Sequence, residues 1–223
     1  MTPDPLSEKY YGVSPYAFCN NDPVNFVDLD GEDIWEIDKD GVITWKNKLD
    51  EHRLYSLNAE NNRGDNYIVV KNPEILKNLE GEGVKQYTSV DGVSDFLKVF
   101  KFAADNSNVE WALHQSEGNE YTITTIHDES KAGSWEDLGI SKPKATIHSH
   151  PNVPNTTYDE NYSMGLVREE NNKARAFLDC DWDNVRKDIE KNHLKARRSY
   201  VYFPNSKNIY YITYNGPKLI KTL

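Results

Sequence analysis

The stretch that most constrains this chain is residues 144–151, with the sequence KATIHSHP. Apolar residues alternate with threonine up to the first histidine, which predicts a short strand. His148 and His150 lie two residues apart on this extended backbone, so both imidazoles are expected on the same face. Pro151 ends the pairing, because proline has no amide hydrogen to donate to a neighbouring strand. The two imidazoles are either a metal site, with zinc as the first candidate, or a pair of surface histidines.

A strand that ends in His-Ser-His-Pro resembles the core of the JAB/MPN (JAMM) metalloproteases. The motif of that family is an upstream Glu, then His-x-His-Pro, then Ser-x-x-Asp at the start of a helix. The resemblance implies an α+β fold with a JAB/MPN-like (cytidine-deaminase-like) mixed β-sheet flanked by helices. It also implies a Zn2+ ion held by His148, His150 and one aspartate, and amide or isopeptide hydrolysis by a metal-bound water. Ser149 would be a support residue or an oxyanion donor.

The upstream glutamate of this motif is expected on the strand that follows the first helix. Residues 91–106 predict that helix, because their apolar side chains recur at helical spacing. The strand expected at 109–115 carries Glu110 on the face opposite to its bulky apolar residues. Glu110 is therefore the candidate general base, ahead of Glu117 and Glu120 at the following turn. Its alternative role is that of a solvated edge residue.

Two aspartates compete as the third metal ligand, which the family carries at a helix start. Asp159 closes the sequence Thr-Thr-Tyr-Asp, which has the form of Ser-x-x-Asp with Thr in place of Ser. Asp181 opens a helix predicted to run to residue 189 and to lead directly into a tyrosine-rich strand. The family order of elements favours Asp181, and residues 152–178 would then be an insertion over the site.

The first 33 residues predict an irregular arm. Turn-forming pairs such as Asp-Pro, Ser-Pro and Asp-Gly alternate there with aromatic residues, without a helical or strand period. This pattern resembles the end of the RHS-repeat-associated core, the C-terminal seam of polymorphic toxin shells. In that family a variable toxin domain follows the seam and is delivered into a rival cell. The resemblance implies a secreted effector of interbacterial competition within a larger RHS protein, with a cognate immunity protein as partner.

The rest of the chain is predicted as two parts. Residues 34–90 are a small β-rich lead-in that begins with a hairpin around an Asp-Gly turn. Residues 91–223 are the JAB/MPN-like domain, with further hairpins expected at 109–127 and 199–214 and a last strand at 218–223.

Composition argues against several classes of partner. The formal net charge of -10 argues against a nucleic-acid partner, because such binding needs a basic surface. The two cysteines are too few for a disulfide framework, and no apolar run is long enough to span a membrane. The resemblance to the metalloproteases implies a protein or peptide substrate. Two alternatives are a metal-dependent nuclease, whose phosphates nearby acidic residues would repel, and a non-catalytic JAB/MPN-like binding module.

Overall fold

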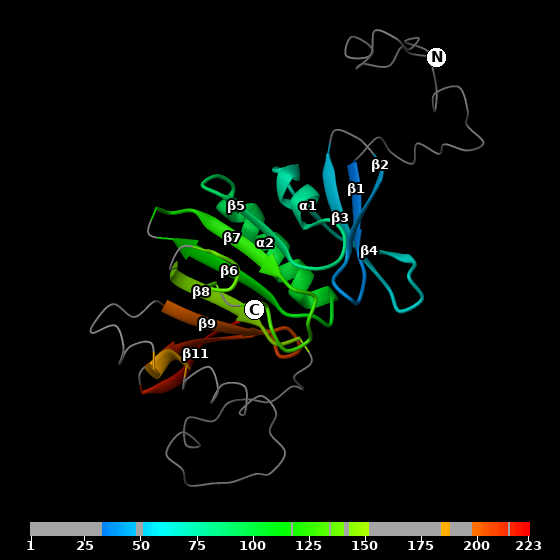
Figure 1. Ribbon diagram of the computed structural model, residues 1–223. Helices are drawn as coiled ribbons and strands as arrows, with labels where there is room; N and C mark the ends of the chain where they lie inside the picture. Colours follow the sequence, from blue (N-terminus) through cyan, green and yellow to red (C-terminus); the bar gives the residue numbers. More distant parts are fainter. Residues whose placement is uncertain are drawn as a thin grey trace, which may run out of the picture.

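The computed structural model describes residues 33–47, 51–116, 118–133, 135–140, 143–151, 184–187, 198–213 and 215–223. These ranges form two β-sheets, and helix α2 packs on the larger one (Figure 1). In chain order the elements are β1 (Asp33–Ile37), β2 (Ile43–Asn47), β3 (His52–Leu57), β4 (Arg63–Val69), α1 (Pro73–Leu79), β5 (Lys85–Ser89), α2 (Val93–Asn106), β6 (Trp111–Ser116), β7 (Tyr121–Thr125), β8 (Pro143–Ser149), β9 (Arg198–Phe203), β10 (Asn208–Thr213) and β11 (Gly216–Thr222). The expected arm lies outside the described residues, apart from residue 33, which begins β1.

The smaller sheet begins with the predicted hairpin. Its strand order is β2-β1-β3-β4, with β1 antiparallel to β2 and parallel to β3. The Asp38 carboxylate holds the turn between β1 and β2, because it accepts hydrogen bonds from the backbone N of Asp40 (3.0 Å) and of Val42 (2.9 Å). The polar sequence 58–65 predicts a loop throughout, but β4 already begins at Arg63.

The larger sheet is a mixed sheet with the order β11-β10-β9-β8-β6-β7-β5. Strands β8 and β9 run parallel, and the other neighbours run antiparallel. The predicted hairpins at 109–127 and 199–214 correspond to β6–β7 and β9–β10. The architecture is therefore α+β with a mixed sheet, and Figure 1 shows β8 near the middle of that sheet.

Helix α2 packs on the larger sheet through most of the predicted apolar stripe, whereas Val93 and Leu97 of that stripe are exposed. Phe96 and Phe100 are buried, and the ring of Phe96 stacks on Tyr87 of β5 with 5.8 Å between centroids. The sequence predicts Asp91 as the N-cap of this helix, but that prediction is wrong. Gly92 occupies the cap with φ of 83°, a left-handed conformation that glycine adopts without a steric penalty.

Helix α1 and strand β5 are not predicted by the hydrophobic pattern. Helix α1 has seven residues, which is too short for a clear helical period. Its start still carries a signal, because the Asn72 side chain accepts a hydrogen bond from Glu74 N (3.1 Å) and Pro73 follows the cap. Strand β5 has the sequence KQYTS, in which Tyr87 is the one apolar side chain.

One hydrophobic core joins the two sheets. Trp35 and Leu76 from the expected lead-in belong to the same cluster of buried residues as Phe96 and Trp111. Strand β5 also precedes the expected boundary at residue 90, yet it pairs with β7 in the larger sheet. The packing therefore continues across that boundary.

The helix expected to begin at Asp181 is described only in part. Residues 184–187 are helical, and Val185 is buried. Asp181 itself lies outside the described residues. Among the described residues, no helix is both long enough and apolar enough to cross a lipid bilayer.

Candidate functional site

The pairing of β6 with β8 brings the candidate base to the candidate ligands. Ala112 on β6 is paired with His148 on β8 in an antiparallel ladder. Just beyond the end of this ladder, the same register brings Glu110 near His150. The Glu110 Oε1 and His150 Nδ1 atoms are 2.5 Å apart. Glu110 is thus beside the histidines and not a solvated edge residue.

The two histidines converge through their Nε2 atoms. These atoms of His148 and His150 lie 3.3 Å apart, and the rings are nearly perpendicular, with an angle of 86° between their planes. Two imidazole nitrogens bound to one tetrahedral zinc at about 2.0–2.1 Å would lie about 3.3–3.4 Å apart. The spacing of the two Nε2 atoms therefore fits a shared zinc ion.

Glu110 approaches His150 from the ring atom that faces away from this convergence. Its carboxylate contacts Nδ1, and the short distance is not aligned as a regular hydrogen bond. Contacts of this kind are common around zinc, because a carboxylate on one ring nitrogen orients the other nitrogen toward the metal. The contact places the Glu110 carboxylate directly against His150.

Glu110 and His150 are buried, and an aromatic side chain of β9 lies beside the site. The exposed fractions of Glu110 and His150 are 3% and 6%. The ring of Phe203 on β9 lies 5.5 Å from the His150 ring, and the backbone N of His150 donates a hydrogen bond to Tyr202 O at 2.9 Å. Sequence analysis does not identify Phe203, although its register beside the His150 end of β8 follows from the parallel β8–β9 pair. Burial of the Glu110 and His150 side chains strengthens the electrostatic interaction between them.

Ser149 points to the opposite face of β8. Its Oγ accepts a hydrogen bond from the backbone N of Trp111 (3.0 Å), and its side chain is fully buried. Because side chains alternate along a strand, this hydroxyl is turned away from the histidines on either side of it. The contact fits the support role expected for Ser149.

The third ligand is not placed. Asp159 and Asp181 both lie outside the described residues, as does Glu117. Within the described parts of the chain, no group of three or more His, Cys, Asp or Glu side chains is arranged to hold a metal ion. The described part of the candidate centre therefore consists of His148 and His150, with Glu110 in contact with His150.

The remaining histidines of the larger sheet have other contacts. His114 Nδ1, on β6, lies 2.9 Å from Thr146 Oγ1 on β8. His127 contacts two backbone carbonyl oxygens, those of Gly83 (2.6 Å, from Nδ1) and Gly41 (3.2 Å, from Nε2). Both histidines therefore have structural partners.

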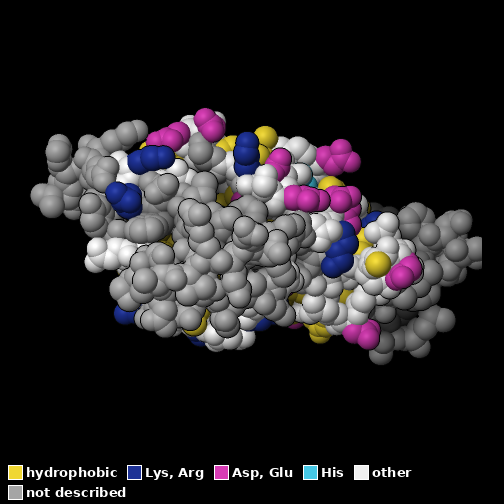
Figure 2. All heavy atoms as spheres, turned by 90° about the horizontal axis from the view of Figure 1, so that it is seen from below, with side chains coloured by type: hydrophobic (Ala, Val, Ile, Leu, Met, Phe, Trp, Pro, Cys, Tyr) yellow, Lys and Arg dark blue, Asp and Glu magenta, His cyan; other side chains and the backbone are white. Residues whose placement is uncertain are grey.

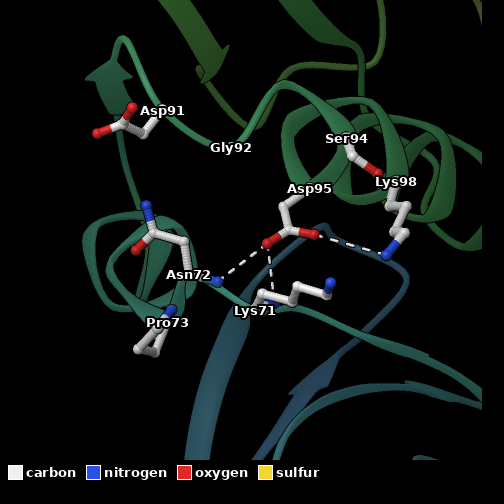
Figure 3. A pocket seen from close by; sticks show the side chains of 8 residues that line it. All are labelled: Lys71, Asn72, Pro73, Asp91, Gly92, Ser94, Asp95 and Lys98. Carbon is white, nitrogen blue, oxygen red and sulfur yellow. Dashed lines mark hydrogen bonds and ion pairs between the residues drawn. The ribbon is translucent and has the colours of Figure 1, made fainter.

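A separate cavity of about 410 Å³ opens at the start of α2 (Figure 3). The buried Asp95 carboxylate accepts hydrogen bonds there from the backbone N of Lys71 (2.7 Å) and Asn72 (2.9 Å). The Lys98 ammonium lies 3.5 Å from the other oxygen of Asp95. These contacts tie α2 to the segment before α1, so the polar groups of this cavity have a structural use.

Comparison with protein families supports one part of this interpretation. Residues 88–179 match the family model of JAB-like toxin 1. The match covers less than half of the chain but includes α2, β6, β7 and β8, with Glu110 and both histidines. It supports a JAB-like toxin domain in this chain. Asp159 lies inside the matched residues, whereas Asp181 lies just beyond them. Comparisons with curated proteins and with solved structures gave no match.

Proposed function

We propose that the JAB-like toxin domain of this chain is a zinc-dependent metallopeptidase that hydrolyses amide or isopeptide bonds. The observation that carries this proposal is the convergence of His148 Nε2 and His150 Nε2 at 3.3 Å, with Glu110 in contact with the second ring. That spacing suits two ligands of one tetrahedral zinc ion. The JAB/MPN-like (cytidine-deaminase-like) arrangement of the sheet belongs to the same proposal.

Each residue of the site has a proposed task. His148 and His150 would hold zinc through Nε2, with Asp181 or Asp159 as the third ligand. When bound, zinc would supply a water molecule acidic enough to be deprotonated at neutral pH. Glu110 would take that proton and return it to the leaving amine. One Glu110 oxygen contacts His150 Nδ1, so the proton transfer requires the other oxygen to reach the metal-bound water.

The biological setting of this activity is also a proposal. A JAB-like toxin domain fits delivery into a target cell as part of a larger RHS protein, with a cognate immunity protein and a protein or peptide substrate. Charge favours such a substrate over a nucleic acid, because the chain carries a net charge of -10. On the face seen in Figure 2, the described lysine and arginine side chains are scattered among acidic ones.

The first prediction concerns metal content. Protein purified without chelator is expected to contain about one zinc per chain, and His148→Ala should lose it, because one imidazole cannot replace two ligands. Glu110→Gln should keep zinc and lose cleavage of peptide substrates by at least about a hundredfold, the usual size of a general-base contribution. Elemental analysis and peptide cleavage followed by mass spectrometry measure the two effects.

His52→Ala is the matched control, because His52 lies on β3 and pairs with Asp33 in the smaller sheet. Asp159→Ala and Asp181→Ala, measured side by side, assign the third ligand to whichever variant loses zinc. Unchanged zinc content in His148→Ala would remove the site. Zinc without cleavage in the unaltered chain would favour a non-catalytic binding module, and degradation of plasmid DNA would favour a nuclease.

A further inference from the structure

A second polar cavity lies on the same sheet face as the candidate metal centre. Its volume is about 140 Å³, and strands β5, β6 and β7 supply most of its lining. Gly139 and Ile140, from the segment before β8, complete the lining. A cavity of about 150 Å³ accommodates a molecule the size of benzene, so this one has room for a single long side chain.

The register of the strands places this cavity on the site face. His114 is paired with Thr122 on β7, and Thr122 with Thr88 on β5, so these three side chains lie side by side. His114 on β6 is four residues after Glu110, which directly precedes this strand, and alternate side chains of an extended backbone share one face. At about 3.4 Å per residue, the cavity begins about 14 Å from Glu110.

The chemistry of the lining suits a cation. It consists of hydroxyl groups, one amide, one imidazole and one carboxylate, from Thr88, Ser116, Thr122, Gln86, His114 and Glu120. None of the described residues that line it is lysine or arginine. Lys144 on the neighbouring β8 turns its ammonium to Asn119 Oδ1, at 2.6 Å.

The Glu120 carboxylate is the one charged group of this lining. Its backbone is fixed, because Glu120 N donates to Ser116 Oγ (3.2 Å) and Ser116 N donates to Glu120 O (2.9 Å). No ion pair among the described residues uses its side chain, which is exposed at the rim. A single acidic group beside several hydrogen-bond acceptors is the arrangement that recognises an amine or a guanidinium.

We propose that this cavity binds a lysine or arginine side chain of the substrate, at a position remote from the bond that is cleaved. That the bound side chain belongs to a substrate rests on the proposed peptidase function, whereas binding of the cation rests on the cavity alone. An extended peptide advances by the same length per residue as a strand, so the basic side chain lies about four residues from the reacting bond.

The test is a ligand titration followed by NMR in the whole chain. The probes are Nα-acetyl-lysine methylamide, Nα-acetyl-arginine methylamide and the neutral Nα-acetyl-norleucine methylamide. The two cationic probes are expected to shift the backbone amide signals of Thr122 and Gly139 in a saturable way, at millimolar Kd. Norleucine should bind several-fold more weakly. Raising the salt concentration should weaken the cationic probes, because exposed charges are screened.

Glu120→Gln removes the charge and keeps the shape, so the Kd of the cationic probes should rise about threefold, the size expected of an exposed charge pair. Glu129→Gln is the matched control, because Glu129 is exposed and does not line the cavity. Equal binding of norleucine, equal Kd values in the two variants, or no shift at Thr122 and Gly139 would each overturn the proposal.

The same titration separates this proposal from the proposed function. The His148→Ala variant, which is expected to lose zinc, should bind the lysine probe with unchanged Kd. If the unaltered chain binds the lysine probe but never binds zinc, the cation site is supported and the proposed peptidase function is contradicted. If the chain binds zinc but not the lysine probe, the peptidase proposal stands and the proposal that this cavity is a substrate subsite is contradicted.

Discussion

At the scale of single residues, the contact between Glu110 and His150 decides how the site is interpreted. A carboxylate that is 3% exposed loses most of its hydration, and such a group needs a charged or hydrogen-bonding partner. The Glu110 carboxylate lies 2.5 Å from His150 Nδ1. The Nε2 atom of the same ring is directed at His148, so one buried pair places the acid beside a candidate ligand.

Ser149 allows a second prediction at this scale, because its hydroxyl is the acceptor for a buried backbone N–H. Ser149→Ala leaves the Trp111 N–H without that acceptor, so the free energy of unfolding is expected to fall by about 1–2 kcal/mol. Zinc content should be unchanged, because the hydroxyl is turned away from the histidines. Urea unfolding and elemental analysis measure the two quantities.

Ser94→Ala is the comparison for this change, since Ser94 is exposed on α2 and should tolerate it. If Ser149→Ala has normal stability but loses zinc, the support role of Ser149 is contradicted, and its hydroxyl would instead contribute to metal binding.

Part of the candidate site can be predicted from residue alternation alone. The shared face of His148 and His150, and the choice of Glu110 over the turn glutamates, both follow from the period of two in a strand. The cavity at Glu120 cannot be found in this way. It depends on which strands pair with β7, and the polar sequence of β5 gives no apolar pattern from which that pairing could be predicted.

At the scale of elements, Asp105 joins the end of α2 to the strands β9 and β10. It accepts hydrogen bonds from Lys101 on α2 (2.5 Å) and from the Tyr202 hydroxyl on β9 (2.6 Å). Lys207, at the β9–β10 turn, lies 2.9 Å from it. Burial alone would raise the pKa of Asp105, but these three partners together lower it below its usual value. Burial and the bond to Asp105 also raise the pKa of Tyr202, so this hydroxyl remains a donor.

The lowered pKa of Asp105 makes part of the stability dependent on pH. Its contribution is present above the unfolded value of about 4 and is lost as the pH falls through the lower folded value. Asp105→Asn should therefore lower the free energy of unfolding at pH 7 by about 1 kcal/mol, with the difference shrinking as the pH falls through the folded value. Urea unfolding at pH 7, 5 and 3 measures it.

Asp65→Asn serves as the control for a surface carboxylate, because Asp65 is exposed in β4. A difference between Asp105→Asn and the unaltered chain that stays the same at all three pH values would show that Asp105 acts by shape and not by charge.

Helix α2 shows how far element prediction reaches. Fourteen residues with an apolar stripe are long enough for the helical period to be visible, so its body is predicted correctly. Its cap is not, because Asp91 is a good capping residue by type, whereas the backbone turns through the left-handed Gly92 one position later. Instead, Asp95 in the first turn accepts the backbone N–H groups of Lys71 and Asn72 (Figure 3).

At the scale of the whole molecule, the two sheets share both core and polar contacts. The turn between β1 and β2 meets the segment after α2, where Asn108 N donates to Lys39 O (2.7 Å) and Lys39 Nζ donates to Asn106 O (3.1 Å). His127 reaches the carbonyl oxygens of Gly41 and Gly83 from the end of β7. These contacts link residues far apart in the sequence, so local patterns could not reveal them.

The last prediction follows from this shared packing. A fragment of residues 91–223, the expected catalytic domain, should not fold alone, because it lacks β5 and the buried side chains that the earlier residues add to the core, such as Trp35, Ile75 and Leu76. Each fully buried aliphatic side chain contributes about 1.5–3 kcal/mol, and a domain has only about 5–15 kcal/mol of net stability. The fragment should give a poorly dispersed 15N–1H spectrum and bind no zinc, whereas the whole chain gives a dispersed one. A dispersed spectrum for the fragment, with zinc bound, would show instead that the sheet carrying Glu110, His148 and His150 is stable without the residues before α2.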